Sequence, residues 1–312
     1  MSTFLATMAP AKQKNNTQID RPLRADADRA AGLLRYKRST NDKGLNYYLH
    51  LPPQKTEGAP VLVAVHGVSC NAKEQAEQFG RIASRFGFVV VAPHFTRSCF
   101  PAYQRLGFRD GKYISDPGGA LLAVLNEVSA TTGADTSRIY LFGYSGGGQY
   151  VHRIAMKYPY RVHRIVVGAP GWLTFPDATT NYPRGLLGAP GFDADLFLQI
   201  PALLLVGNLD RERDPALNTS AKLDGQQGKN RVERGKRWIG TMRRAAHLRA
   251  IPDYDFRFEL LPDCAHLFID CCQDGNLVLR SMSFFLENHA SIDRTEPGQT
   301  TGYLLFSAGG DR

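Results

Sequence analysis

Cysteine is scarce in this chain. It occurs five times in 312 residues, an odd and small number that excludes a fold held together by a framework of disulfide bonds. The spacing of the cysteines matches no zinc-site pattern, so we expect no metal site, and the adjacent Cys271 and Cys272 are poorly suited to bond each other. These features predict reduced thiols in a cytoplasmic protein.

Long apolar runs are also missing. No stretch approaches the roughly 18 residues needed to cross a bilayer, so we expect no membrane association. The first residues, MSTFLATMAPAKQKNNTQ, contain no basic region followed by a long apolar core and make a poor secretory signal. Residues 1–28 mix small, polar and charged types without periodicity and are expected to form a mobile arm, and residues 291–312 a tail.

Acidic residues are too few to balance the basic ones, and the formal net charge is +9. The excess is local: residues 211–250 hold eleven Lys and Arg against four Asp and Glu, and residues 1–43 hold nine against four. No basic motif interleaved with aromatic residues accompanies these segments, so we expect no nucleic-acid binding. The basic segment 211–250 raises the hypothesis that an anionic substrate is favoured.

Apolar strand-like runs alternate with helical patterns along the chain. The buried strands are expected at residues 60–67, 88–93, 138–143, 164–170 and 201–207, and the helices at 73–87, 116–133, after Ser145, and at 276–289. Residues 33–51 predict two strands around a turn, and the alternating run 255–261 predicts a strand near a sheet edge. This order predicts an α/β fold with a mostly parallel, doubly wound sheet flanked by helices.

Two segments do not fit a strand or helix of this sheet. Residues 172–200 are rich in Pro, Gly and Asp, and residues 211–250 are basic. Both are expected to be lid-like insertions or pocket walls in a single domain spanning residues 29–290. The irregular stretch 94–116 is a third candidate for selecting a substrate.

A serine flanked by glycines follows the strand 138–143, in the sequence Gly-Tyr-Ser-Gly-Gly at residues 143–147. Small residues two before and two after the serine let a strand and a helix approach closely enough to form a strained turn that exposes the hydroxyl. We predict that Ser145 is a nucleophile; the alternative is a glycine-rich loop with an incidental serine. Gly148 lies beyond the motif and predicts close approach of the helix to a neighbouring segment.

A serine hydroxyl needs a base, and the base needs a carboxylate to orient it. His266 follows the strand 255–261 and precedes the last helix, and Asp210 follows the strand 201–207. Their order along the chain, Ser, then acid, then His, is the order that accompanies this kind of turn. We therefore predict Asp210 as the acid and His266 as the base, with Asp214 as an alternative acid on a surface loop.

An oxyanion needs two hydrogen-bond donors. The N–H of Gly146, which follows the nucleophile, is one candidate. The other is expected in the loop after the strand 60–67, from the N–H of Val68 or, as a substitute, of Ser69. His66 and Gly67 are expected to shape this loop rather than to transfer protons.

The sequences HGVSCNA, GYSGGGQ, GNLD and CAH together resemble the α/β-hydrolase superfamily over roughly residues 33–290. The first of them is similar to the esterase and polyhydroxyalkanoate-depolymerase-like branch, with dienelactone-hydrolase-like enzymes as neighbours. The resemblance implies hydrolysis of a small-molecule ester through an acyl-enzyme. Ser145 would attack, His266 would move the proton and Asp210 would orient His266, without a metal or an organic cofactor.

Aromatic residues near the site are candidates for substrate binding. Phe95 and Trp172, with Phe100 and Phe175, either line an apolar acyl pocket or pack in the core. His66 and Tyr144 join the candidates because they adjoin the oxyanion loop and the nucleophile. Two other functions remain open: a serine peptidase of the same fold, and a non-catalytic binding protein that retains the fold.

Overall fold

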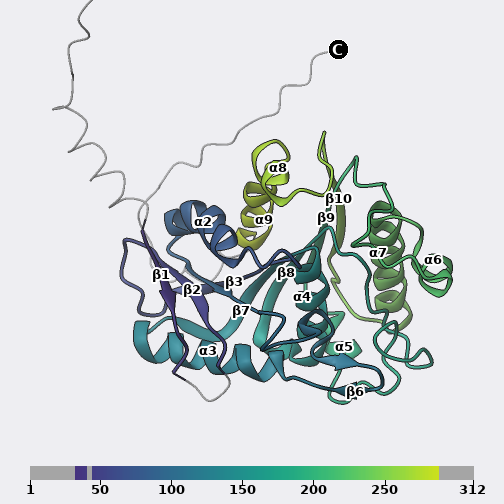
Figure 1. The fold of residues 1–312 in the computed structure, drawn as a ribbon, viewed down its shortest axis with the longest axis horizontal. Helices are drawn as coiled ribbons and strands as arrows, with labels where there is room; N and C mark the ends of the chain where they lie inside the picture. Colours follow the sequence, from purple (N-terminus) through teal and green to yellow (C-terminus); the bar gives the residue numbers. More distant parts are fainter. Residues whose placement is uncertain (1–31, 41–43, 288–312) are drawn as a thin grey trace, which may run out of the picture.

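A mixed sheet of eight strands runs through the centre of the molecule (Figure 1). The computed structural model describes residues 32–40 and 44–287. The expected arm 1–28, the tail 291–312 and most of the first turn lie outside the described residues. The strands are β1 Leu33–Lys37, β2 Tyr47–Leu51, β3 Pro60–Val65, β4 Val89–Pro93, β7 Asp135–Tyr144, β8 Val162–Gly168, β9 Ala202–Gly207 and β10 Phe256–Leu261.

The strand order is β1-β2-β4-β3-β7-β8-β9-β10. The pairs β1–β2 and β2–β4 are antiparallel, and every other neighbouring pair in this sheet is parallel. The expected doubly wound, mostly parallel sheet is therefore confirmed, and β10 is an edge strand, as its alternating pattern predicted. β7 begins three residues earlier than the apolar run, because Asp135 pairs with Pro60 before the register shifts.

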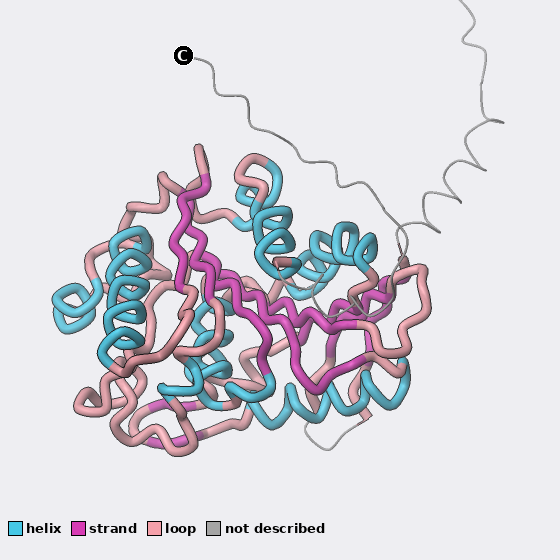
Figure 2. Tube along the Cα trace, turned by 180° about the vertical axis from the view of Figure 1, so that it is seen from behind, coloured by secondary structure: helices cyan, strands magenta, loops and turns pink. Residues whose placement is uncertain are grey.

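Helices cover both faces of the sheet (Figure 2). Alternate residues of the central strands face opposite sides, so that Val61, Val63 and Val65 join one apolar core while Leu62 and Ala64 join the other. The first core packs under α3, α4 and α7, and the second under α2, α8 and α9. The helices are α2 Ala72–Ala83, α3 Pro117–Thr132, α4 Gly146–Lys157, α5 Ala194–Phe197, α6 Ala221–Gln227, α7 Arg231–Leu248, α8 Phe268–Gln273 and α9 Leu277–Leu286.

The expected ends of α3 are confirmed. The Asp116 carboxylate accepts a hydrogen bond from the N–H of Gly119 at 2.9 Å, Pro117 is the first helical residue, and Gly133 ends the helix with a φ of 72°.

Among the described residues, no helix has the length and apolar character needed to span a membrane.

Residues 94–116 contain short ordered elements rather than an irregular stretch. They form a 3-10 turn, η2 Tyr103–Arg105, and a small hairpin of β5 Phe108–Arg109 and β6 Lys112–Tyr113. The segment 172–200 packs against this hairpin, with the rings of Tyr182 and Phe108 5.1 Å apart, and the Tyr182 hydroxyl donates to the carbonyl of Arg105 in η2 at 2.9 Å. Within 172–200, the short α5 precedes β9.

The segment 211–250 was expected to be an insertion without a place in the sheet, and this expectation is wrong. It contains α7, an 18-residue helix that packs on β9 and β10 and connects them in the usual way for parallel strands. The buried residues of α7 recur at helical spacing: Val232, Gly235, Trp238, Ile239, Met242, Ala245 and Ala246. Two buried arginines on the same helix, Arg231 and Arg234, obscured this periodicity in the sequence.

Candidate active site

Ser145 occupies a sharp turn between the end of β7 and the start of α4. Its backbone has φ 54° and ψ −110°, a conformation that a residue with a side chain rarely adopts. The Ser145 N–H donates to the carbonyl of Gly168 at 2.8 Å, which holds the turn against the end of β8. The serine side chain therefore stands at the carboxyl edge of the sheet, where active sites of open α/β sheets lie.

The glycines around Ser145 are required by close packing. A Cβ at Gly143 would overlap the carbonyl of Gly147, and a Cβ at Gly147 would overlap the carbonyl of Val65. At Gly148 a Cβ would lie 2.8 Å from the carbonyl oxygen of Gly168, closer than real Cβ contacts. The expected close approach of α4 to a neighbouring segment is thus confirmed, and the segment is β8.

The structure brings Ser145, His266 and Asp210 together from the ends of three strands. Nε2 of His266 lies 3.0 Å from Oγ of Ser145, and Nδ1 lies 2.7 Å from Oδ2 of Asp210. The Asp210 side chain is buried, whereas His266 is 27 % exposed and open to a substrate. The His266 ring stacks on Tyr144, with ring centroids 5.6 Å apart. This geometry fits the tautomer in which Nδ1–H donates to Asp210 and Nε2 accepts from the serine hydroxyl.

Arg231 of α7 holds the other oxygen of Asp210, a contact that sequence reasoning missed. Its Nη1 donates to Oδ1 of Asp210 at 3.0 Å and also to Oδ2 of Asp214. Asp214, the alternative acid, thus contacts Arg231, and the described hydrogen bonds of His266 go to Asp210 and Ser145. Burial of Asp214 opposes its charged form, but the hydrogen bond and charge of Arg231 outweigh burial and lower the pKa of Asp214.

The loop after β3 lies directly over the start of α4. As the first residue of α4, Gly146 has a backbone N–H without an acceptor inside the helix. A Cβ at Gly146 would lie 3.3 Å from Cγ1 of Val68, so the two predicted oxyanion donors belong to adjoining segments. The Cys70 N–H donates to the carbonyl of Gly67 at 3.2 Å, which tightens the loop that carries Val68.

His66 is buried in the framework under this loop, so its expected role in substrate binding is wrong. Its Nδ1 contacts the carbonyl of Gly67 at 2.6 Å, and its Nε2 accepts from the N–H of Phe95 at 3.0 Å. Burial lowers the pKa of His66 to about 4, so the ring is neutral at pH 7. His66 shapes the loop, as the sequence analysis also expected.

The other aromatic candidates divide between core and cavity. Phe95 is fully buried and stacks on Tyr103, with ring centroids 5.0 Å apart, so it packs in the core and lines neither of the two cavities described below. Trp172 is half-buried and lies 4.5 Å from the guanidinium of Arg153, outside both cavities described below. Phe175 is also buried. Tyr144 does line the cavity at Ser145, and its hydroxyl lies 3.2 Å from Sγ of Cys271.

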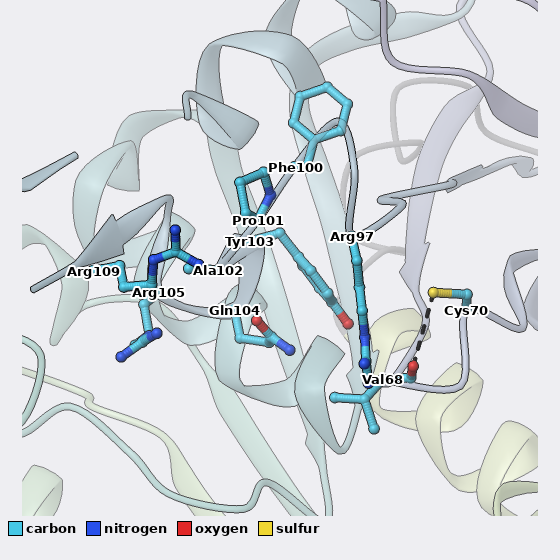
Figure 3. Close-up of a pocket in the computed structure, with 10 residues that line it drawn as sticks. All are labelled: Val68, Cys70, Arg97, Phe100, Pro101, Ala102, Tyr103, Gln104, Arg105 and Arg109. Atoms are coloured by element: carbon cyan, nitrogen blue, oxygen red, sulfur yellow. Dashed lines mark hydrogen bonds between the residues drawn. The ribbon is translucent and has the colours of Figure 1, made fainter. Parts of the chain in front are cut away.

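Two cavities adjoin the Ser145 turn. One of about 320 Å³ is lined by Ser145 and His266, by the loop 67–71, and by apolar residues of the segment 267–269. The second, of about 290 Å³, is lined by residues 97–109 with Val68 and Cys70 (Figure 3). Val68 borders both. The expected pocket-wall segment 172–200 contributes to neither, and 211–250 contributes Ala216.

Metal-ligating side chains do not gather in the described part of the chain. Within residues 32–40 and 44–287, no three His, Cys, Asp or Glu side chains are grouped so that they could hold a metal ion. The polar groups next to Ser145 are instead paired with one another in the network of His266, Asp210 and Arg231.

The sheet order, the helices on both faces and the strained serine turn define the α/β-hydrolase fold. The model of the esterase PHB depolymerase family matches residues 45–181, from β2 to the loop after β8. This match includes Ser145, whereas Asp210 and His266 lie beyond it. The chain thus has the α/β-hydrolase fold and, over residues 45–181, resembles the esterase PHB depolymerase family.

Solved structures and curated relatives agree with this assignment. A poly(3-hydroxybutyrate) depolymerase from Bordetella parapertussis is 26 % identical, with a TM-score of 0.67 over 85 % of this chain and 94 % of the other. Poly(aspartic acid) hydrolase-1 from Sphingomonas sp. KT-1 is 24 % identical, with a TM-score of 0.69 over 82 % and 97 %. Feruloyl esterase B of Talaromyces funiculosus is 27 % identical over 126 residues, which are 38 % of this chain. The match spans 34 % of that relative's length, about a third.

Proposed function

We propose that this protein hydrolyses carboxylic esters through an acyl-enzyme formed on Ser145. The observation that carries the proposal is the pair of hydrogen bonds at His266, 3.0 Å to Oγ of Ser145 and 2.7 Å to the Asp210 carboxylate. The names of the curated relatives, feruloyl esterase B and acetylxylan esterase A, support an ester as the substrate.

The proposed reaction has two halves. In the first, Oγ of Ser145 attacks the ester carbonyl while Nε2 of His266 takes the hydroxyl proton, and Asp210 stabilises the imidazolium. The oxyanion accepts hydrogen bonds from the N–H groups of Gly146 and Val68, and the C–O bond to the alcohol breaks as His266 returns the proton to it. In the second half, water adds to the acyl-enzyme by the same proton path and releases the acid.

The test is labelling by a fluorophosphonate, which reacts with activated serines. Wild-type protein should be labelled at Ser145, and Ser145→Ala should lose labelling together with a factor of about 10⁴ to 10⁶ in kcat on para-nitrophenyl esters. Ser220→Ala is the matched control, because Ser220 is exposed and its hydroxyl makes no capping bond in α6. Unlabelled wild type, or labelled Ser145→Ala, would contradict the proposal.

The same preparation separates an esterase from a peptidase. An aminoacyl para-nitroanilide and the para-nitrophenyl ester of the same acyl group share the acyl part and differ in the leaving group. We expect turnover of the ester and little turnover of the anilide. Comparable kcat/KM on the two would make the protein a peptidase instead.

A further inference from the structure

Three arginines line the cavity of about 290 Å³ beside the oxyanion loop. Figure 3 shows Arg97 next to Val68 and Tyr103, and Arg105 and Arg109 on the opposite side of the cavity, with Gln104 between them. All three arginines come from the segment 97–109 and lie outside the basic segment 211–250.

The positive charge of this cavity is poorly compensated. Among the described residues, Arg97 and Arg105 form no ion pair with a carboxylate, and Arg109 has a single loose contact of 3.9 Å with Asp110, which is 87 % exposed. Exposed ion pairs of this kind have a small interaction free energy, so Asp110 compensates little of the charge of Arg109. The cavity therefore presents guanidinium groups whose charge is free to attract an anion.

A fourth arginine, Arg153, lies behind the cavity-lining residue Gln104 and adds to the positive charge. Arg153 of α4 is fully buried, and its Nη1 donates to the carbonyl of Gln104 at 2.6 Å while its Nε donates to Oγ1 of Thr174 at 2.8 Å. Its Nη2 is buried without a hydrogen-bond partner. Burial is the main cause that lowers the pKa of Arg153 to about 10, and the nearby charge of Arg105 acts in the same direction, as expected where like charges gather.

The cavity begins at the oxyanion donors. A Cβ at Gly146 would lie 3.0 Å from the Tyr103 hydroxyl and 3.2 Å from Cγ of Gln104, and both residues line the cavity. The cavity on the other side of Val68 is different in character: it is lined by Leu267, Phe268 and Ile269 and holds an acidic residue, Glu74. One side of the Ser145 turn is thus cationic and the other mainly apolar.

We propose that Arg97, Arg105 and Arg109 bind a carboxylate carried by the substrate. The preferred esters then have an anionic group on one side of the ester bond, in the acyl or the alcohol part, and an apolar group on the other side. The inference rests on the proposed esterase function and adds a substrate class to it. A guanidinium offers a planar fork of donors that matches a carboxylate. Three guanidinium groups around one cavity can bind a carboxylate at slightly different positions within it. The ester carbonyl would then lie at Val68, between the two cavities.

This assignment moves the expected anion selectivity away from residues 211–250. Two arginines of that segment are already occupied, since Arg231 pairs with Asp210 and Asp214, and Arg234 pairs with Asp224 at 3.0 Å. Arg244, by contrast, is exposed on α7 and belongs to neither cavity at Ser145. It serves as a matched control for a nonspecific effect of surface charge.

The experiment compares pairs of esters of similar size, in which one member carries a carboxylate and the other is neutral. One pair varies the acyl arm: the para-nitrophenyl monoester of adipic acid against para-nitrophenyl hexanoate, with equal numbers of acyl carbons. The other varies the alcohol arm: meta-acetoxybenzoate against its methyl ester. The readout is the ratio of kcat/KM for the charged ester to that for the neutral one, measured at low and high salt.

We expect the ratio to favour the charged ester by about tenfold in one of the two pairs and to fall at high salt, which screens the exposed guanidiniums. Arg105→Gln and Arg97→Gln should each lower the ratio several-fold, mainly through KM, Arg105→Glu should bring it below one, and Arg105→Lys should lie between wild type and Arg105→Gln. Arg244→Gln should leave it at the wild-type value.

Ratios near one in both pairs, or a ratio that falls equally in Arg244→Gln, would overturn the carboxylate pocket while leaving the esterase proposal intact. Failure of the esterase proposal looks different, since neither member of a pair would then be cleaved and fluorophosphonate would not label Ser145. The three arginines are at least partly exposed, so loss of folding is not expected to obscure the comparison.

Discussion

At the scale of single residues, the proposed acid Asp210 shares its counter-ion with a second carboxylate. Nη1 of Arg231 contacts both Asp210 and Asp214, and the Arg231 side chain is 1 % exposed. Without the guanidinium, two carboxylates would face each other with one of them buried, a costly arrangement. We therefore expect Arg231 to act as a positioning residue that holds Asp210 aimed at His266.

Replacement of Arg231 tests this role. We expect Arg231→Gln to lower the free energy of unfolding by about 3–5 kcal/mol, because it breaks a buried ion pair. It should also lower kcat more than it raises KM, with Arg231→Lys restoring part of kcat by returning the charge. Asp214→Asn should have a smaller effect on both, since the pair of Arg231 with Asp210 remains. Chemical denaturation and steady-state kinetics on the same preparations measure the two quantities, and full kcat in Arg231→Gln would contradict the role.

At the scale of the elements, Gly148 of α4 and Gly240 of α7 both lie inside a helix, but in different surroundings. Gly148 of α4 lies against the carbonyl of Gly168, whereas no atom of another segment lies within 4 Å of the position that a Cβ at Gly240 of α7 would occupy. Interior glycine costs a helix about 1 kcal/mol relative to alanine. The first glycine is needed for packing on β8, and the second is not.

Two alanine substitutions should therefore change stability in opposite directions. Gly240→Ala should raise the free energy of unfolding by about 0.5–1 kcal/mol, and Gly148→Ala should lower it by about 1–3 kcal/mol because α4 must move away from β8. Urea denaturation of the two variants measures the difference. Stabilisation by Gly148→Ala would show that α4 is free to shift.

The elements near the site differ in how well the sequence predicted them. The turn at Ser145 and the proximity of Asp210 and His266 could be predicted because each is encoded by a short local pattern at the end of an apolar strand. The helix α7 could not be predicted, because Arg231 and Arg234 occupy two of its buried positions and interrupt the apolar periodicity from which a helix is inferred. Phe95 and the arginine-lined cavity depend on tertiary contacts with Tyr103 and Val68, which no local pattern contains.

At the scale of the whole molecule, two buried histidines join segments that are distant in the sequence. His66 accepts from the N–H of Phe95, and His152 of α4 accepts from the N–H of Thr174 at 3.0 Å while its Nδ1 contacts the carbonyl of Gly148 at 2.8 Å. Burial lowers the pKa of both rings, to about 4 for His66. Each ring must therefore stay neutral for these connections to persist.

Acid should weaken the fold through these rings. In the unfolded chain His66 takes up a proton near pH 6.5, but in the folded protein only near pH 4. The contribution of neutral His66 to the free energy of unfolding is therefore fully present above pH 6.5 and is lost as the pH falls toward 4. The His66 contribution corresponds to about 3 kcal/mol. Unfolding free energies measured across this range should fall with decreasing pH.

A His66→Gln variant should show a shallower dependence on pH than wild type, and His247→Gln, which changes an exposed histidine, should show the same dependence as wild type. If His66→Gln does not fold, the wild-type curve alone decides, because a flat curve between about pH 6.5 and about pH 4.5 would contradict neutral buried rings.

The proposed base stands just beyond β10, the outermost strand, whereas the nucleophile follows β7 in the middle of the sheet. An outermost strand has a single hydrogen-bonded neighbour, here β9, and local opening costs less at such a border than at the centre. Fraying of β10 would carry His266 away from Ser145 while most of the sheet stayed assembled. On warming, ester turnover should therefore be lost at a lower temperature than the far-UV circular dichroism signal of the folded protein.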